Sequence, residues 1–151
     1  MGLKLNKLKK TTYENTEKFD LINKTVIAKI VKVYDGDTVW ATFYLHNKIY
    51  KFNIRLYGID TPEMKPPKNQ ENRESEILEA KKSKKYLENL ILNKIVLIEL
   101  LGKDKYGRIL GNIIINNKKF FFSEKINVNK LMVSKGLAYE YFGKTKKKYI
   151  N

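Results

Sequence analysis

The stretch "TVIAKIVKVYDGDTVWATFYLHNKIYKFNIRLY" at residues 25–57 decides the fold of this chain. It contains three segments rich in β-branched and aromatic residues, which are typical of strands. In the third segment, at 49–57, apolar and polar positions alternate. Its two faces carry Tyr50, Phe52, Ile54 and Leu56 on one side and Lys51, Asn53, Arg55 and Tyr57 on the other. Because "DGD" and "HNK" are short polar turns, we predict three consecutive antiparallel strands.

The remainder of the chain predicts a helix followed by further strands. All three prolines fall within 58–75, which therefore forms a loop. Helical spacing of apolar residues predicts a helix over 75–93, before strands at 94–101 and 109–115. A turn is expected at 116–118, and a short helix over 127–136 that stops at Gly136. This order predicts an α+β OB-fold, a five-stranded Greek-key β-barrel with one helix between strands 3 and 4 and a short helix near the C-terminus.

Length and composition set the organisation of the chain. Its 151 residues suggest one folded domain over 25–142, with a polar lead-in at 1–24 and a basic tail at 143–151. It contains no cysteine, which excludes disulfides and Cys-based zinc sites. No apolar run approaches the roughly 20 residues of a membrane span, and no signal peptide is visible.

The chain is strongly basic, with 31 Lys and Arg against 16 Asp and Glu and a formal net charge of +15. Such a field attracts polyanions, namely nucleic acid, anionic membrane or acidic protein, although a solvated lysine surface gives the same count. Aromatic residues make up 12% of the chain and favour nucleic acid, because bases stack on aromatic rings.

Three polar turns carry the residues from which we predict a site. They are "DGD" at 35–37, "DTPE" at 60–63 and "DKYGR" at 104–108. Each alone is an ordinary turn. A three-stranded meander, however, brings the first turn and the end of the third strand to one end of the barrel, so Asp37 is expected near Arg55, Asp60 and Glu63.

The residue types in these turns suit metal-assisted chemistry on a phosphate. Two carboxylates and a backbone carbonyl form a hard oxygen site, which Ca²⁺ or Mg²⁺ prefers over zinc. Two arginines beside that site match a phosphodiester, and Glu63 can accept a proton from water. The sole histidine, His46, excludes a metal cluster built from several histidines, and we expect it to be solvated in its hairpin.

At these motifs the chain resembles the staphylococcal nuclease (thermonuclease) family. Three motifs of the family occur in order, namely "DGDTV" at 35–39, "RLYGIDTPE" at 55–63 and "DKYGR" at 104–108. The predicted helix lies between the second and the third, and a further matching segment is "VNKLMVSKGLA" at 128–138. The resemblance runs from about 25 to 141. It implies a Ca²⁺-dependent endonuclease on an OB-fold that cuts DNA and RNA, preferably single-stranded, and leaves 3′-phosphate ends.

The resemblance also assigns roles to single residues. Asp37, Asp60 and the Thr61 carbonyl are implied metal ligands, Glu63 the general base, and Arg55 and Arg108 the phosphate clamp. Further contacts to the substrate or the site are implied for Asp35, Lys105, Tyr106, Tyr139 and Tyr141. A core role for either of the last two tyrosines is equally compatible with the sequence.

Two other functions remain open from the sequence. The first is an OB-fold that binds nucleic acid without cleaving it, and the second is a basic domain that docks on anionic lipid. The compartment is open as well. A site with few protein ligands binds Ca²⁺ weakly, which favours a secreted or cell-surface protein, where Ca²⁺ reaches the millimolar range.

Overall fold

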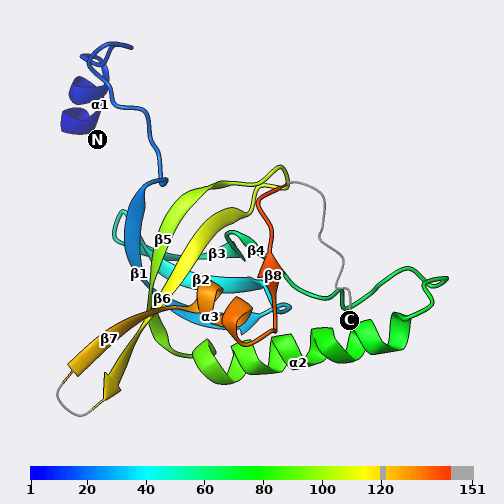
Figure 1. The fold of residues 1–151 in the computed structure, drawn as a ribbon. Coiled ribbons are helices and arrows are strands. Elements are labelled where there is room, and N and C mark those ends of the chain that lie inside the picture. Colours follow the sequence, from blue (N-terminus) through cyan, green and yellow to red (C-terminus); the bar gives the residue numbers. More distant parts are fainter. Residues whose placement is uncertain (120–121, 144–151) are drawn as a thin grey trace.

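The computed structural model describes residues 1–119 and 122–143 and shows a closed β-barrel with three helices (Figure 1). Hydrogen bonds join the strands in the order β3-β2-β1-β5-β6, and a parallel pairing of β3 with β6 closes the ring. The predicted α+β OB-fold is therefore confirmed. The five barrel strands are β1 (Lys24–Val33), β2 (Thr38–Leu45), β3 (Lys48–Leu56), β5 (Ile95–Lys103) and β6 (Ile109–Lys119).

Smaller elements surround this barrel. Helix α2 crosses one side of it, β7 extends the sheet beyond β6, and β4 pairs with β8 in a separate two-stranded ribbon (Figure 1). Their bounds are α1 (Gly2–Leu8), β4 (Ile59–Asp60), α2 (Arg73–Ile91), β7 (Phe122–Asn127), α3 (Val128–Ser134) and β8 (Tyr139–Glu140). The two helices predicted from the sequence correspond to α2 and α3.

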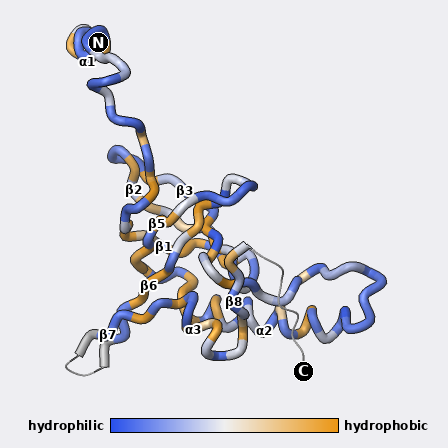
Figure 2. Tube along the Cα trace, turned by 45° about the horizontal axis from the view of Figure 1, so that its top comes forward, coloured by the Kyte–Doolittle hydropathy of each residue, from blue (hydrophilic) through white to orange (hydrophobic). Residues whose placement is uncertain are grey.

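The core fills the barrel and the space under α2. Ile54 and Leu56 on the predicted inner face of β3 are fully buried, as are Leu87 and Ile91 of α2 and Met132 of α3. Hydrophobic positions recur along the strands of the barrel, whereas the segment before β1 is largely hydrophilic (Figure 2). The period-2 pattern thus indicated the inward side of β3 correctly at Ile54 and Leu56, whereas Tyr50 on the same predicted face is 47% exposed.

One local prediction was wrong, and one helix was not predicted. The lead-in contains α1, a seven-residue helix without a buried residue. The turn expected at 116–118 does not exist, because β6 continues through Lys119 and pairs with β7. Cross-strand pairing of Asn116 and Asn117 overrides their preference for turns. The lead-in and tail boundaries stay predictions, and 144–151 lie outside the described residues.

Asn129 of α3 forms hydrogen bonds at the junction where β3 pairs with β6 and closes the barrel. Its side-chain amide donates to the carbonyl oxygens of Tyr57 (2.9 Å) and Gly111 (3.0 Å), and its oxygen accepts the Ile113 N–H (3.2 Å). The residue is 2% exposed. One buried side chain therefore satisfies backbone groups on both strands that close the barrel.

We predict that Asn129→Ala destabilises the fold by about 2–4 kcal/mol, because it leaves buried backbone groups without partners. Chemical denaturation measures this loss. Asn89→Ala, at an exposed position of α2, is the matched control and should change the free energy of unfolding by less than about 0.5 kcal/mol. Equal losses in the two variants would contradict the role given to Asn129.

Candidate active site

Arg55, at the end of β3, joins two acidic side chains. Its Nη2 atom lies 3.1 Å from Asp37 Oδ2 and 3.0 Å from Asp60 Oδ1, and its Nη1 donates to the Leu56 carbonyl at 3.1 Å. The cross-strand pair of Thr38 with Arg55 sets this arrangement, because it places the start of β2 beside the end of β3. The two carboxylates therefore converge on one cationic nitrogen.

The turn before β2 is built so that Asp37 faces the segment after β4. Thr61 donates to Asp37 Oδ2 from both its backbone N–H (3.2 Å) and its hydroxyl (3.1 Å). A Cβ atom on Gly36 would lie 2.9 Å from both Ser83 Cβ and Thr61 Cγ2, so this position requires glycine. Asp35 accepts the Asp37 N–H at 3.2 Å. Each residue of "DGD" thus has its own part in the turn.

Asp37 is buried next to opposing charges. Burial raises its pKa from 3.8 to about 7; Arg55 lowers the pKa in part, and the neighbouring Asp35 carboxylate raises it. The side chain is 7% exposed, and that of Asp60 is 9% exposed. A second cation near these oxygens would favour the ionised form of Asp37.

The oxygen atoms of Asp37 and Asp60 form a donor set that fits a hard cation. Arg55 Nη2 shows that both carboxylates stabilise positive charge at a shared point. Among the residues that the structure describes, no group of three or more His, Cys, Asp or Glu side chains is arranged so that it could hold a metal ion. These two carboxylates would thus need further oxygen ligands from the backbone, water or a bound phosphate.

Arg108 reaches the same centre from the β5–β6 hairpin. Its Nε pairs with Asp104 Oδ2 at 2.6 Å, and its Nη1 lies 3.4 Å from the Thr38 hydroxyl. Thr38 in turn donates to Asp37 Oδ1 at 2.9 Å. Burial pushes the pKa of Asp104 upward, but hydrogen bonds from Arg108 and from the Tyr106 N–H outweigh it and hold the pKa below its usual value. Asp104 therefore stays ionised and orients the guanidinium.

Glu63 lies two residues after Thr61 in the chain and is exposed, whereas Thr61 is buried. Its backbone N–H donates to Glu76 Oε1 of α2 at 3.0 Å, which ties the "DTPE" turn to the helix. The backbone is therefore fixed close to Thr61, while the residue as a whole is exposed. That position suits a group that meets a water molecule.

The structure also places the tyrosines and the lysine for which further contacts to the substrate were implied. Tyr139 donates from its hydroxyl to Asp60 Oδ2 at 3.1 Å, because β8 pairs with β4. Tyr141 is half-buried and donates its backbone N–H to the Gly58 carbonyl at 2.9 Å. Lys105 and Tyr106 lie at the exposed hairpin tip, with Lys105 Nζ 5.1 Å from the Tyr106 ring centroid. Tyr139 thus contacts the carboxylate centre through Asp60, and Tyr106 contacts Arg108, whose Cζ lies 5.6 Å from the Tyr106 ring centroid.

Sequence reasoning missed Thr38 and Ser83 as parts of this site. Thr38 links Asp37 to Arg108, and Ser83 Oγ of α2 donates to the Leu137 carbonyl at 2.6 Å, just before β8. Ser83 is 1% exposed and sits on the inward face of α2. Its small polar side chain among apolar helix positions was the one signal that the sequence offered.

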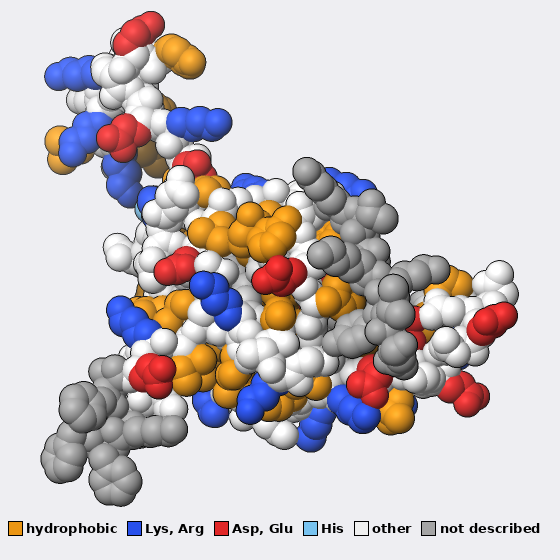
Figure 3. All heavy atoms as spheres, viewed as in Figure 1, with side chains coloured by type: hydrophobic (Ala, Val, Ile, Leu, Met, Phe, Trp, Pro, Cys, Tyr) orange, Lys and Arg blue, Asp and Glu red, His pale blue; other side chains and the backbone are white. Residues whose placement is uncertain are grey.

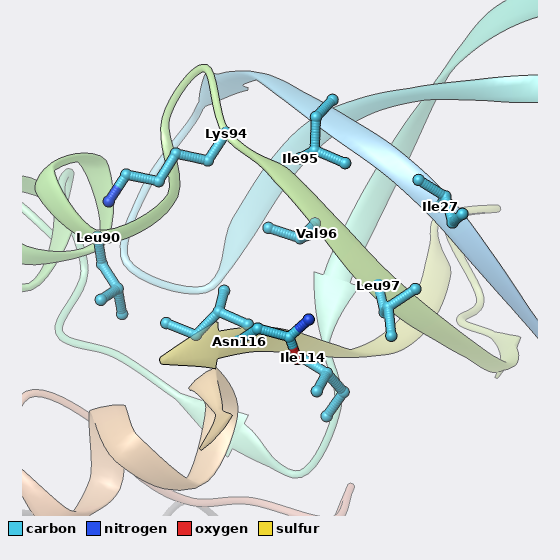
Figure 4. A pocket seen from close by; sticks show the side chains of 9 residues that line it. Ile27, Leu90, Lys94, Ile95, Val96, Leu97, Ile114 and Asn116 are labelled. Carbon is cyan, nitrogen blue, oxygen red and sulfur yellow. The ribbon is translucent and has the colours of Figure 1, made fainter. Parts of the chain in front are cut away.

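An apolar groove lies on another part of the barrel. It runs over β1, β5 and β6 beside the end of α2 (Figure 4). Its lining residues are Ile27, Leu90, Lys94, Ile95, Val96, Leu97, Ile114, Ile115 and Asn116. The groove lacks acid–base groups apart from Lys94, so the carboxylate centre is the better candidate for catalysis.

Among the described residues, no helix has the length and apolar character needed to cross a membrane.

Comparisons with known proteins match this chain to one family and to several relatives. A model of the family described as "Staphylococcal nuclease homologue" matches residues 53–151. An uncharacterized protein of Methanocaldococcus jannaschii is 34% identical over 145 residues, which cover 86% of this chain and 66% of that protein.

Two other relatives carry nuclease names. A staphylococcal-like nuclease of Arabidopsis thaliana is 31% identical over 130 residues, covering 85% of this chain and 32% of its own length. An uncharacterized endonuclease of Haemophilus influenzae is 34% identical over 113 residues, which cover 75% of this chain and 51% of that protein. The chain thus spans about one third to two thirds of the length of these relatives.

The raised pKa of Asp37 predicts a specific pH dependence of stability. Because the folded pKa exceeds the unfolded one, the contribution of this group is complete below about pH 4 and is lost as the pH rises through about 7. In chelator, the stability of the parent relative to Asp37→Asn should therefore fall between these limits, by at most about 1.4 kcal/mol per pH unit.

Urea unfolding of both proteins at pH 5 and pH 8 measures this difference. The comparison with Asp37→Asn cancels the titration of the other groups, which the two proteins share. A stability difference that is the same at both pH values would contradict the buried, partly neutral Asp37.

Proposed function

The chain belongs to the staphylococcal nuclease family, and on this basis we propose that it is a Ca²⁺-dependent nuclease acting on phosphodiester bonds of DNA and RNA, preferably single-stranded, that leaves 3′-phosphate ends. The observation that carries the proposal is the single Arg55 nitrogen held between Asp37 and Asp60, with Arg108 connected to the same aspartate through Thr38. It combines a hard oxygen site with two guanidinium groups, and both suit the charge that develops on a phosphodiester during hydrolysis.

Asp37, Asp60 and the backbone carbonyl of Thr61 would hold the Ca²⁺ ion. Oxygen donors of this type suit Ca²⁺, whose coordination is more flexible than the octahedron of Mg²⁺. When bound, the ion would supply positive charge against the phosphate oxygens. The Thr61 hydrogen bonds to Asp37 Oδ2 keep that carboxylate in place for this role.

Arg55 and Arg108 would clamp the phosphate. Each guanidinium is held by carboxylates of the chain, so its orientation is set before substrate arrives. Arginine presents two parallel N–H groups to a phosphate, which lysine cannot do. In the transition state these donors would stabilise the extra charge on the phosphate oxygens.

Glu63 would act as general base on the attacking water. The water oxygen forms the new bond to phosphorus, its proton passes to the Glu63 carboxylate, and the bond from phosphorus to the 5′ oxygen breaks. The 5′ oxygen leaves with a proton from solvent, and the phosphate stays on the 3′ side. The exposed position of Glu63 beside Thr61 supports this assignment.

We predict that the purified chain cleaves a labelled single-stranded oligonucleotide in Ca²⁺ and stops when the chelator exceeds the metal. Mg²⁺ should support a lower rate, because it holds its water ligands more tightly. Gel analysis of the products, with and without phosphatase treatment, measures the rate and the 3′-phosphate together. Binding without cleavage in any metal would instead favour an OB-fold that only binds nucleic acid.

Glu63→Gln is the matched variant for this assay. The amide keeps the shape of the side chain but cannot take a proton at neutral pH, so the rate should fall by about 10²–10⁴. Oligonucleotide affinity should persist or rise, because one negative charge is removed. Parent-like cleavage by Glu63→Gln would refute the general-base role and leave the metal assignment intact.

A further inference from the structure

The outer face of the β1–β2–β3 sheet carries a ladder of side chains that starts at the catalytic centre. Strands β2 and β3 lie side by side (Figure 1) and pair in a continuous antiparallel register. Because side chains alternate between the two faces of a strand, every second pair points outward. The outward pairs are Thr38 with Arg55, Trp40 with Asn53, Thr42 with Lys51, and Tyr44 with Ile49. Arg55 is thus the first step of a surface that continues along the barrel.

Two aromatic rings stand on this ladder. Trp40 and Tyr44 share the outward face of β2, and Tyr44 is 71% exposed. Trp40 is half-buried, with Lys51 Nζ 5.7 Å from its ring centroid. Neither Trp40 nor Tyr44 belongs to the hydrophobic core or to the side chains packed against it, so core packing does not explain these rings. They offer flat surfaces on which bases stack.

The charge of this face has one sign. Lys29 and Lys32 of β1 pair with Thr42 and Trp40, and Lys51 flanks the rings on β3. All three lysines are exposed, and β1, β2 and β3 contain no Asp or Glu. On the face that Figure 3 shows, by contrast, acidic side chains stand among the basic ones. The outer face of β1–β2–β3 therefore complements a phosphate backbone.

The ladder is also continuous with the candidate active site. Trp40 is two residues from Thr38, a rise of about 7 Å along a strand. A nucleic acid that crosses these rings therefore enters the space beside Arg55. Only a single strand leaves its bases free to stack on protein rings, whereas a duplex presents mainly its phosphates.

We propose that the outer face of β1–β2–β3 is a binding track for single-stranded nucleic acid that leads into the catalytic centre. Bases stack on Trp40 and Tyr44, and Lys29, Lys32 and Lys51 contact the backbone phosphates. The track deepens the proposed function and rests on it only for the reaction at its end, because the rings and lysines bind a single strand whether or not cleavage follows.

Trp40 is the only tryptophan of the chain, so its fluorescence reports directly on the track. We predict that a 12-nucleotide single strand in chelator quenches this emission, with intact oligonucleotide recovered afterwards. A trinucleotide should bind at least about tenfold more weakly, because it reaches fewer rings and lysines. Hairpin DNA and heparin should bind through charge with little quenching.

Variants of the track provide the second readout. Tyr44→Ser should weaken 12-mer binding by about tenfold and trinucleotide binding much less, since stacking is lost for one base. The double variant Lys29→Gln with Lys51→Gln should also weaken 12-mer binding by about tenfold and trinucleotide binding much less. The matched control is Lys81→Gln with Lys85→Gln on the exposed side of α2, which removes the same charge elsewhere. Thermal melting checks that each variant is folded.

Two results would overturn the track. The first is equal weakening by the α2 pair and the track pair, which would show general charge attraction. The second is equal quenching by heparin or hairpin DNA, which would exclude base stacking. Absence of cleavage alongside ring-dependent binding would refute the proposed nuclease activity and leave the track standing, so the two failures are distinguishable.

Discussion

The shared contact of Arg55 Nη2 with Asp37 and Asp60 is the interaction on which the rest of the site depends. All three side chains are at least 88% removed from solvent, with exposures of 12%, 7% and 9%. Buried charges of this kind are tolerated only when they are paired, and the loss of one partner typically costs about 3–5 kcal/mol. The guanidinium thus ties β2, β3 and β4 together at the end of the barrel where the candidate site lies.

Other contacts hold the C-terminal segment against this centre. Ser83 of α2 bonds to the Leu137 carbonyl, and the following residues form β8, which pairs with β4 and brings the Tyr139 hydroxyl to Asp60. Asn129 fastens α3 to the seam that closes the barrel. The barrel, α2 and α3 therefore act as one support for two carboxylates and two arginines. Such pre-organisation is what electrostatic catalysis requires.

Much of this architecture could be predicted from the sequence because it depends on local periodicity. Alternation in β3 correctly separated buried Ile54 and Leu56 from Arg55, and the meander placed Asp37 beside Arg55 and Asp60. The continuation of β6 past Asn117 could not be predicted, because pairing with β7 decides it. The roles of Thr38, Ser83 and Asn129 also escaped prediction, since each depends on a partner far away in the chain.

Substitution of Arg55 by lysine isolates the role of the forked guanidinium, because it keeps the charge and removes the two parallel donors. We expect a folded Arg55→Lys protein whose single-turnover cleavage of single-stranded DNA in Ca²⁺ is slower by about 10²–10³. The chain has one arginine outside the centre, Arg73 at the start of α2, and Arg73→Lys should retain the parent rate. Parent-like cleavage by folded Arg55→Lys would show that the shared contact is a structural ion pair and would contradict the account.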